Sequence, residues 1–238
     1  MDAKNISQIN SKYFDFKTLT KYEDHLVCQH VGWSGLSIIK FDIKKGKNLS
    51  NSFIDSHYHD LCNKEKIFVI TKGTLELKSS EYEISLGKFD AVDFISESQN
   101  YQINCLEDST VFMISSKNLK NFNGKPVFFN FKKNITSKDL WGGQCISRPY
   151  EGRGLTVVLF DLKAGFKFED KGHSNEQITW LIGGSMDFYA NGNNKTLTPD
   201  NGVDVGPNHI HGGISAGAIG FDAFFPKREE VKYKGQND

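Results

Sequence analysis

Short runs in which apolar and polar residues alternate make up most of this chain. A period of two places every second side chain on the same face of a strand, and the spacing of an amphipathic helix is hard to find. Turn-forming segments such as KKGKN, NGNNK and PDNG separate the runs. The pattern therefore predicts an all-β protein. The clearest runs are GLSIIKFDI, KIFVITKGTLEL, TVFMISS, GLTVVLFDL, QITWLIGGSMDF and IGFDAFF.

The chain also contains an internal repeat. GLSIIKFDIKKG begins at Gly35 and matches GLTVVLFDLKAG, which begins at Gly154, an offset of 119 residues (154 minus 35). KIFVITKGTLEL begins at Lys66 and matches QITWLIGGSMDF, which begins at Gln177, an offset of 111 residues (177 minus 66). The difference between the offsets means that the first copy holds eight extra residues between these two segments.

A third pair of segments keeps the smaller offset. AVDF begins at Ala91 and GVDV begins at Gly202, again 111 residues apart (202 minus 91). Three matches in the same order indicate two copies of one β unit. We therefore expect two domains of the same kind, covering residues 1–118 and 119–238.

Charge and targeting signals narrow the class of protein. Lysine plus arginine and aspartate plus glutamate both number 29, so the formal net charge is zero, whereas nucleic-acid binders usually show a basic excess. We therefore expect no nucleic-acid partner. The chain has no apolar run long enough for a membrane span, and its start lacks the pattern of a secretory signal. The four cysteines form no CxxC motif, so we expect a cytoplasmic protein with reduced thiols and no membrane partner.

The second copy carries polar residues that are costly to bury. Lys171, His173 and Gln177 are separated by even numbers of residues, so an extended segment would place them on one face. His209 and His211, in PNHIHGG, also share a face by the same rule. Buried imidazole and amide groups cost free energy unless something binds them. The spacing therefore indicates a binding site for a metal or a polar ligand.

These motifs resemble those of the cupin superfamily. The first cupin motif reads glycine, five residues, HxH, a short gap, Glu or Gln, six residues and glycine, and the segment from Gly165 to Gly184 follows it closely. The second motif ends in a proline turn and one more histidine, as does the segment that begins at Pro207. Because the resemblance covers both halves, the chain is similar to a bicupin. The resemblance implies two tandem double-stranded β-helix, or jelly-roll, barrels.

The resemblance implies a metal site in the second half. His173, Gln177 and His211 match the family's ligands for one divalent transition metal, such as Fe, Zn, Ni or Mn. Lys171 stands where the first histidine of HxH would be, which leaves three protein ligands and open positions on the metal. A neutral amide would leave the charge of the metal uncompensated and favour an anionic oxygen ligand. Taken alone, His173 is also compatible with a hydrogen-bonded core histidine, and Lys171 with a solvated strand lysine.

Cupins with a glutamine ligand imply non-redox proton-transfer chemistry. We expect an isomerase- or lyase-type reaction on a small oxygenated acid or sugar acid, an anionic small-molecule substrate. His209 is the expected proton carrier, with Lys171 and Tyr189 as further candidates. Arg228, in the segment AFFPKREE, could bind a substrate carboxylate in bidentate fashion or pair with a neighbouring glutamate at the surface.

Two other functions remain open on the sequence alone. A non-haem iron dioxygenase of the cupin type would also use two histidines and a further ligand with open positions on the metal. A non-catalytic small-molecule-binding cupin is compatible with the missing histidine. The family resemblance further implies a homodimer formed through sheet edges.

The first copy departs further from the cupin motifs. His57 and His59 form an intact HxH, but their distance from the preceding glycine is longer than in the second copy. Lys66 occupies the Glu/Gln position with Glu65 beside it, and the segment ESQNYQI has no histidine at the final ligand position. We therefore expect a degenerate, mainly structural first barrel. The alternative is a second metal site made of His57, His59 and Glu65 on the inserted loop.

Overall fold

The chain folds into two compact units. The computed structural model describes residues 11–16, 20–22, 26–32, 35–57, 65–94, 100–116 and 124–228. The described residues from 20 to 134 form the N-terminal unit, and those from 135 to 228, together with the strand Lys12–Asp15, form the C-terminal unit. The expected division after residue 118 differs from these boundaries, because residues 124–134 belong to the N-terminal unit and the first strand belongs to the C-terminal unit.

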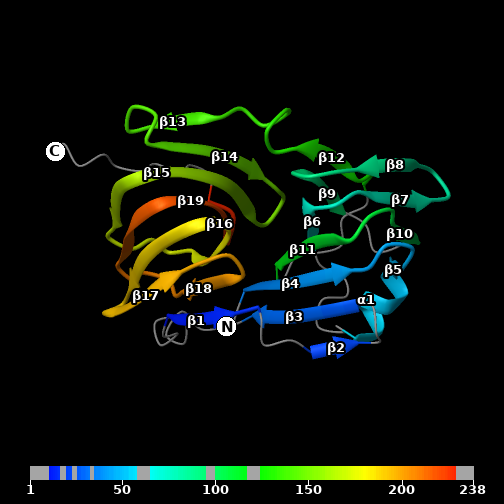
Figure 1. The fold of residues 1–238 in the computed structure, drawn as a ribbon, viewed down its shortest axis with the longest axis horizontal. Coiled ribbons are helices and arrows are strands. Elements are labelled where there is room, and N and C mark those ends of the chain that lie inside the picture. Colours follow the sequence, from blue (N-terminus) through cyan, green and yellow to red (C-terminus); the bar gives the residue numbers. More distant parts are fainter. Residues whose placement is uncertain are drawn as a thin grey trace. The chain divides into compact units, whose positions relative to one another are not determined.

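The N-terminal unit consists of two antiparallel sheets (Figure 1). The larger sheet has the strand order β12-β9-β6-β11-β4-β3-β2, and the smaller sheet has the order β5-β10-β7-β8. Phe68 and Met113 of the larger sheet share one apolar cluster with Leu77 and Ile103 of the smaller sheet. The strands are β2 (Thr20–Tyr22), β3 (Leu26–Gly32), β4 (Leu36–Ile43), β5 (Asn48–Ser50), β6 (Lys66–Lys72), β7 (Leu75–Ser79), β8 (Glu83–Leu86), β9 (Asp90–Phe94), β10 (Tyr101–Cys105), β11 (Ser109–Ser116) and β12 (Val127–Asn130).

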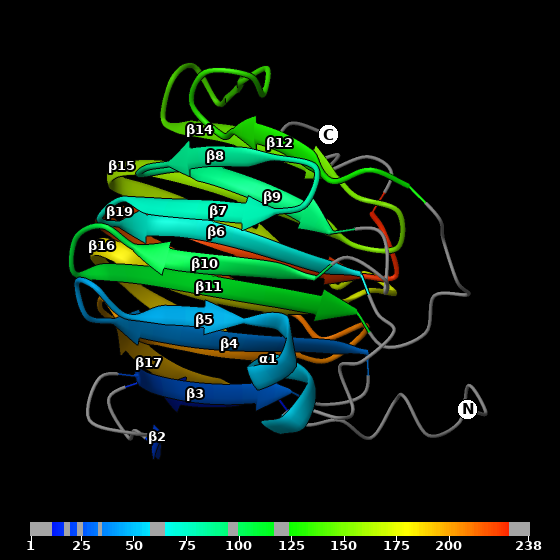
Figure 2. The same ribbon diagram turned by 90° about the vertical axis from the view of Figure 1, so that its right-hand side faces the viewer.

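A short helix, α1 (Asn51–His57), lies within the part of the first copy that holds the extra residues. The backbone N–H of Phe53 donates a hydrogen bond to the Ser50 hydroxyl at 3.2 Å, which satisfies a donor at the start of the helix. Figure 2 shows α1 next to β5. The alternation of residues did not predict this helix. It is the only helix among the described residues, and its seven residues are too few to cross a membrane.

The C-terminal unit is built on three 15-residue strands, which are β15 (Thr156–Asp170), β16 (Glu176–Ala190) and β19 (His211–Phe225). The strand order of its sheet is β1-β18-β16-β19-β15-β14-β13, and β17 also pairs with β16. All pairings are antiparallel, and the expected all-β fold is confirmed in both units. The remaining strands are β1 (Lys12–Asp15), β13 (Lys138–Leu140), β14 (Cys145–Glu151), β17 (Asn193–Leu197) and β18 (Asn201–Val205).

The three long strands bend at shifts in their pairing register. Between β16 and β19 the register shifts on both sides of Gly184, whose φ of +71° is accessible to few residues with a side chain. A Cβ atom at Gly184 would collide with the backbone carbonyl oxygen of Gly217. The bends let one sheet curl around an apolar cluster that includes Phe166, Met186 and Phe188. Gly184 of the first cupin motif is therefore required by the curvature of the barrel.

The N-terminal strand closes one edge of this sheet. β1 pairs with β18 in an antiparallel register in which Lys12 lies opposite Asp204. The hydroxyl of Tyr13 donates to the carbonyl oxygens of Phe188 at 3.0 Å and Asn193 at 2.8 Å. Strand pairing uses backbone groups that every residue carries, which explains why the sequence pattern did not assign this segment to the second copy.

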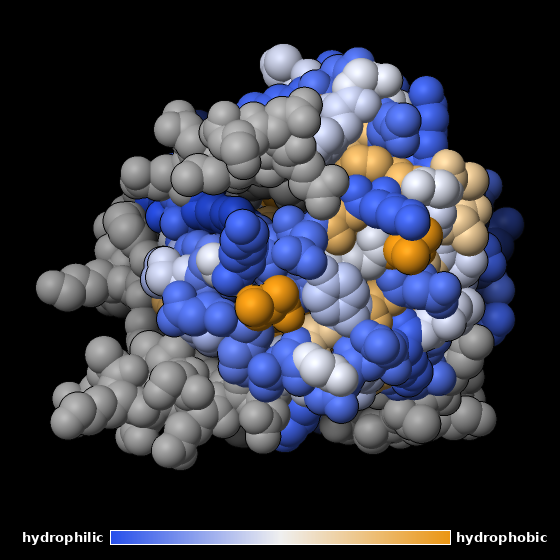
Figure 3. Space-filling model, turned by 90° about the vertical axis from the view of Figure 1, so that its left-hand side faces the viewer, coloured by the Kyte–Doolittle hydropathy of each residue, from blue (hydrophilic) through white to orange (hydrophobic). Residues whose placement is uncertain are grey.

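The apolar residues of the C-terminal unit lie mostly inside the barrel. Figure 3 shows a largely hydrophilic surface in which the hydrophobic side chains form small, separate patches. Among the described residues of this unit, the exposed large hydrophobic side chains are Ile210 and Ile214. Single exposed apolar residues of this kind are common on globular proteins.

A buried carboxyl group on β18 makes stability depend on pH. Val203 and Val205 face the core cluster, so Asp204 between them faces the opposite side of the sheet. Its carboxyl oxygens are buried and have no hydrogen-bond partner among the described residues. Burial, with the nearby Glu176 adding to it, raises the pKa of the Asp204 carboxyl group from its ordinary value of 3.8 to about 8. Between these values the folded state holds a proton that the unfolded state releases, so the free energy of unfolding falls as pH rises through this window.

We expect Asp204→Asn to stabilise the protein at pH 8 by a few kcal/mol, of the order set by the cost of ionising a buried carboxyl group. At pH 5 the effect should be much smaller, because Asp204 is already protonated there in the folded state. Urea unfolding at the two pH values measures both. Asp161→Asn, a change at an exposed strand aspartate, is the control. An Asp204→Asn protein that loses stability between pH 5 and pH 8 as steeply as the unmodified protein would contradict this assignment.

Candidate functional site

The short loop between β15 and β16 positions His173 in the candidate site. β15 ends at Asp170 and β16 begins at Glu176, so residues 171–175 form a loop rather than a continuous strand. Gly172 has a φ of +99° and donates its N–H to the Asp170 carboxylate at 2.9 Å. The backbone N–H of Asn208 donates to the carbonyl oxygen of His173 at 2.7 Å. This contact holds the loop against the turn that precedes His211.

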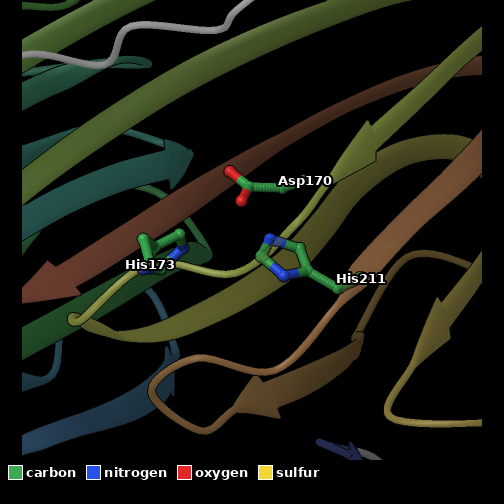
Figure 4. A group of neighbouring side chains, drawn as sticks. All are labelled: Asp170, His173 and His211. Carbon is green, nitrogen blue, oxygen red and sulfur yellow. The ribbon is translucent and has the colours of Figure 1, made fainter.

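Asp170, His173 and His211 come together at this point (Figure 4). One ligand atom from each lies within 4.8 Å of the others, and this is the one such group of histidine, cysteine and acidic side chains among the residues that the structure describes. The two imidazole rings are perpendicular, with centroids 5.3 Å apart. Nitrogen and carboxylate ligands in this combination suit a divalent transition metal.

Gln177 extends the group and is held in one orientation. Its Oε1 lies 2.9 Å from His173 Nε2. Its Nε2 donates to the Thr179 hydroxyl at 2.8 Å and to Asp222 Oδ1 at 3.1 Å. Thr179 in turn donates to the same Asp222 oxygen at 2.6 Å. Because both partners of the amide nitrogen are acceptors, the amide oxygen must face His173.

The two imidazole rings differ in the hydrogen bonding of their Nδ1 atoms. His211 Nδ1 lies 2.9 Å from the carbonyl oxygen of His209, and donation of its proton there leaves Nε2 with a free lone pair. His173 Nδ1 is buried and has no hydrogen-bond partner among the described residues. Burial, with the nearby Arg228 guanidinium, lowers the pKa of His173 to about 4, and burial also lowers the pKa of His211. Both rings are therefore neutral at neutral pH.

Arg228 supplies a positive charge beside the cluster. Its guanidinium Nη2 lies 3.3 Å from Asp170 Oδ2, and the side chain is 13% exposed. The guanidinium also stacks over the Phe224 ring, with 5.1 Å between the carbon and the ring centroid. Burial opposes ionisation of Asp170, but His211, the Gly172 N–H, His173 and Arg228 outweigh it and lower the pKa of Asp170. Asp170 is therefore a carboxylate at neutral pH.

Asp170, Gln177, His211 and Arg228 line a pocket inside the barrel, whereas His173 is not among its lining residues. We call the part of the pocket that the polar side chains line the polar end. Asp222 belongs to it and is buried, which raises the pKa of its carboxyl group to about 6 despite the hydrogen bonds from Thr179 and Gln177. The members of the polar end are Asp170, Gln177, Thr179, His211, Asp222 and Arg228.

The three expected proton carriers, His209, Lys171 and Tyr189, are not among the residues that line the pocket. Lys171 is exposed on the loop after β15. His209 turns its Nδ1 toward the Ser11 hydroxyl at 2.9 Å, and burial lowers its pKa. Tyr189 donates its hydroxyl to Glu169 at 2.9 Å, because it follows the inward-facing Phe188 on β16 and so faces the other way. The alternation used for Lys171 fails because the strand ends at the residue before it.

The structure also brings in residues that the sequence did not single out. Asp170 stands one position before Lys171, so a carboxylate adjacent to the expected histidine position was the available signal. Asp222 lies on β19 opposite Thr179 on β16, and only this pairing brings it to Gln177. The one sign of Asp222 in the sequence is a charged residue within the apolar run IGFDAFF.

The N-terminal unit has apolar residues at the matching positions. Phe68 of β6 lies opposite Met113 of β11, as Thr179 lies opposite Asp222, and both belong to the apolar cluster. His57 is exposed at the end of α1, where its Nδ1 lies 2.9 Å from the Phe53 carbonyl oxygen.

The proposed first-half ligands are only partly described. Glu65 is buried, at 5% exposure, whereas His57 is exposed. His59 lies outside the described residues. The alternative metal site of these three residues therefore remains a prediction.

Comparison with known proteins identifies the fold. No family model matches the chain, and no curated protein matches it. A putative glyoxylate induced protein from Pseudomonas aeruginosa is 10% identical, with 93% of this chain and 90% of that chain covered and a TM-score of 0.74. A cupin 2 conserved barrel domain protein from Leptotrichia buccalis is 13% identical, with 92% and 99% covered and a TM-score of 0.63. The oxalate decarboxylase of Lactobacillus farciminis, solved as a formate complex, is 9% identical, with 92% and 87% covered and a TM-score of 0.73.

The likeness extends over both units, because each comparison covers more than nine tenths of the chain. At these low sequence identities the likeness shows that the backbone folds are similar, and it does not show a shared activity. Together with the curled antiparallel sheets and the placement of His173, Gln177 and His211 around one barrel interior, it leads to one conclusion. This chain has the β-barrel fold of the cupins.

Proposed function

We propose that the C-terminal unit binds one divalent transition metal and acts on a small anionic acid by non-redox proton transfer. The observation that carries this proposal is the convergence of Asp170, His173 and His211, whose ligand atoms lie within 4.8 Å of one another. Gln177 is the fourth candidate ligand. Fe, Zn, Ni and Mn are all compatible with a mixed set of nitrogen and oxygen donors.

The donor set fits a cation. Two donors at right angles, each about 2.1 Å from a metal, are about 3.0 Å apart, and His173 Nε2 lies 2.9 Å from Gln177 Oε1. Burial and the nearby Arg228 lower the pKa of His173 to about 4, so its ring is neutral at neutral pH and can offer a nitrogen lone pair to a cation. Thr179 and Asp222 fix the glutamine amide from behind, as outer partners of metal ligands do.

The charge balance favours an anionic substrate. Arg228 offsets the charge of Asp170, so a divalent cation would leave the polar end with a net positive charge. Arg228 lines the pocket and has further guanidinium N–H groups with which to bind a carboxylate. We assign it this role, in agreement with the sequence-based expectation for Arg228.

The proton carrier must lie within reach of the substrate. Asp222 is a carboxyl group that lines the pocket, and hydrogen bonds from Thr179 and Gln177 hold its Oδ1. We assign to Asp222 the task of taking and returning a proton, in place of the expected His209, Lys171 and Tyr189. A bound divalent metal would supply Lewis-acid stabilisation of the oxygen that gains negative charge.

One observation favours a second candidate function. With Asp170 included, the cluster contains two histidines and one carboxylate, which is the ligand combination of non-haem iron oxygenases. Oxygen consumption by the iron-loaded protein with an added acid would support this alternative.

The test of the main proposal is carbon–hydrogen exchange without oxygen. In deuterium oxide under argon, we expect the metal-loaded protein to exchange the C3 protons of a 2-oxo acid, 2-oxopentanoate, on the order of 100-fold faster than the metal-free protein. Proton NMR measures the exchange. Asp222→Asn should lose most of this rate while retaining metal, because asparagine keeps an acceptor oxygen for Thr179.

The matched control is Asp187→Asn, at an exposed aspartate of β16. It should exchange at the rate of the unmodified protein. Equal exchange by Asp222→Asn and the unmodified protein would remove Asp222 from the mechanism. Oxygen uptake without anaerobic exchange would replace the proton-transfer proposal with the oxygenase.

A further inference from the structure

Aromatic rings follow one another along one side of the pocket. The centroids of Trp141 and Phe166 are 5.1 Å apart, those of Phe166 and Phe168 are 6.1 Å apart, and those of Phe168 and Phe188 are 6.2 Å apart. The last ring, Phe188, stacks on the imidazole of His211 at 6.1 Å. We call Trp141, Phe166, Phe168 and Phe188 the aromatic wall. It leads from a partly exposed tryptophan directly to the metal-site cluster.

The remaining residues that line the pocket are also apolar. They are Cys145, Phe160, Leu162, Met186 and Phe224. Burial raises the pKa of the Cys145 thiol to about 12, so this residue is an uncharged thiol at neutral pH. The charged and amide-bearing side chains of the lining are therefore those of the polar end, where Gln177 bonds to Asp222 and Arg228 pairs with Asp170.

This division limits what the pocket can hold. A small dianion would occupy the polar end and leave the side chains of the aromatic wall exposed to water. A sugar acid would place several hydroxyl groups against carbon atoms, and each buried hydroxyl without a partner costs free energy. A ligand with an acidic head and a flat apolar body satisfies both ends.

We propose that the pocket binds an aryl-substituted carboxylic acid, with its carboxylate at the polar end and its ring along the aromatic wall. This inference rests on the proposed function, because the metal is what makes the polar end attract an anion. It narrows the substrate from the small oxygenated acid or sugar acid expected from the sequence to an acid with an aromatic body.

The test compares acids that share a head and differ in their body. Isothermal titration calorimetry with Zn²⁺-loaded protein would measure the affinities of lactate, 3-phenyllactate and galacturonate. We expect 3-phenyllactate to bind on the order of 10-fold or more tighter than lactate, because its ring becomes buried against apolar side chains. Galacturonate, a sugar acid of similar size, should bind no better than lactate.

A substitution in the aromatic wall separates ring contacts from general affinity. Phe168→Leu keeps an apolar side chain but removes a ring. It should lower the affinity for 3-phenyllactate by roughly 3- to 10-fold and leave the affinity for lactate unchanged. Phe128→Leu is the matched control, since Phe128 is a similarly half-buried phenylalanine that packs on the core of the N-terminal unit. It should leave both affinities unchanged.

The outcomes distinguish this inference from the proposed function. Binding of Zn²⁺ together with equal affinities for lactate and 3-phenyllactate, or tighter binding of galacturonate, would overturn the inference and leave the metal site in place. A protein that takes up no Zn²⁺ would overturn the proposed function, and the inference with it. A Phe168→Leu protein that binds 3-phenyllactate as tightly as the unmodified protein would exclude the aromatic wall as the site of the ring.

Discussion

Replacing His211 with alanine is expected to remove bound metal from the protein. His211 is 3% exposed, its Nδ1 is held by the His209 carbonyl oxygen, and one of its ring nitrogens lies within 4.8 Å of ligand atoms of Asp170 and His173. Loss of a direct ligand should weaken metal binding by roughly 100-fold or more, beyond the 10- to 100-fold typical of outer partners. Elemental analysis of the purified protein, followed by titration of the metal-free protein with Zn²⁺, measures the change.

The neighbouring histidine provides a matched control. His209→Ala removes a side chain that bonds to the Ser11 hydroxyl outside the pocket, so metal content should stay as in the unmodified protein. His211→Gln, which leaves less empty volume, guards against a folding defect, and circular dichroism shows whether each variant is folded. Equal metal content in folded His211→Ala and His209→Ala proteins would exclude the proposed site.

The second large effect is expected at Asp170. Asp170→Asn keeps the shape of the side chain but removes a negative charge next to both imidazoles and leaves Arg228 without its partner. We expect metal affinity to fall roughly 10- to 100-fold, as when a charged ligand or its close partner is lost. Titration of the metal-free protein with Zn²⁺ measures the affinity.

Lys171→Gln is the control for this experiment. It changes the adjacent exposed residue, which stands where the cupin motif has a histidine, and should leave metal affinity unchanged. If Lys171→Gln lowers the affinity for the metal and Asp170→Asn does not, the ligand is residue 171 and not Asp170.

The alternation along the chain was enough to predict strands, the repeat and the all-β class. The resemblance of two motifs to those of cupins, and not the alternation, led to the expectation that His173, Gln177 and His211 lie near one another. The barrel bends had a local signal in Gly184. These features depend on neighbours close in sequence, where the period of a strand decides which way a side chain faces.

The rest depended on contacts between distant segments. Asp170, and not Lys171, lies beside the two histidines. β15 ends at Asp170, and the alternation of side chains does not extend into the loop that follows. Tyr189 faced away from the pocket, since only the curl of the sheet decides which face of β16 lies inside. The two units also differ at one pair of facing positions, which only the strand pairing reveals. The C-terminal unit has Thr179 opposite Asp222, and the N-terminal unit has Phe68 opposite Met113.

The sequence by itself therefore determined the class of fold and the duplication, and it predicted three members of the candidate site and Arg228. Tertiary structure alone decided that Asp170 and Asp222 lie beside them, that His209 turns toward Ser11, and that the strand Lys12–Asp15 completes the C-terminal unit. The physical reason is that a strand's own residues set the direction of its side chains, whereas pairing and curvature, which involve backbone groups far apart in the chain, decide what those side chains meet.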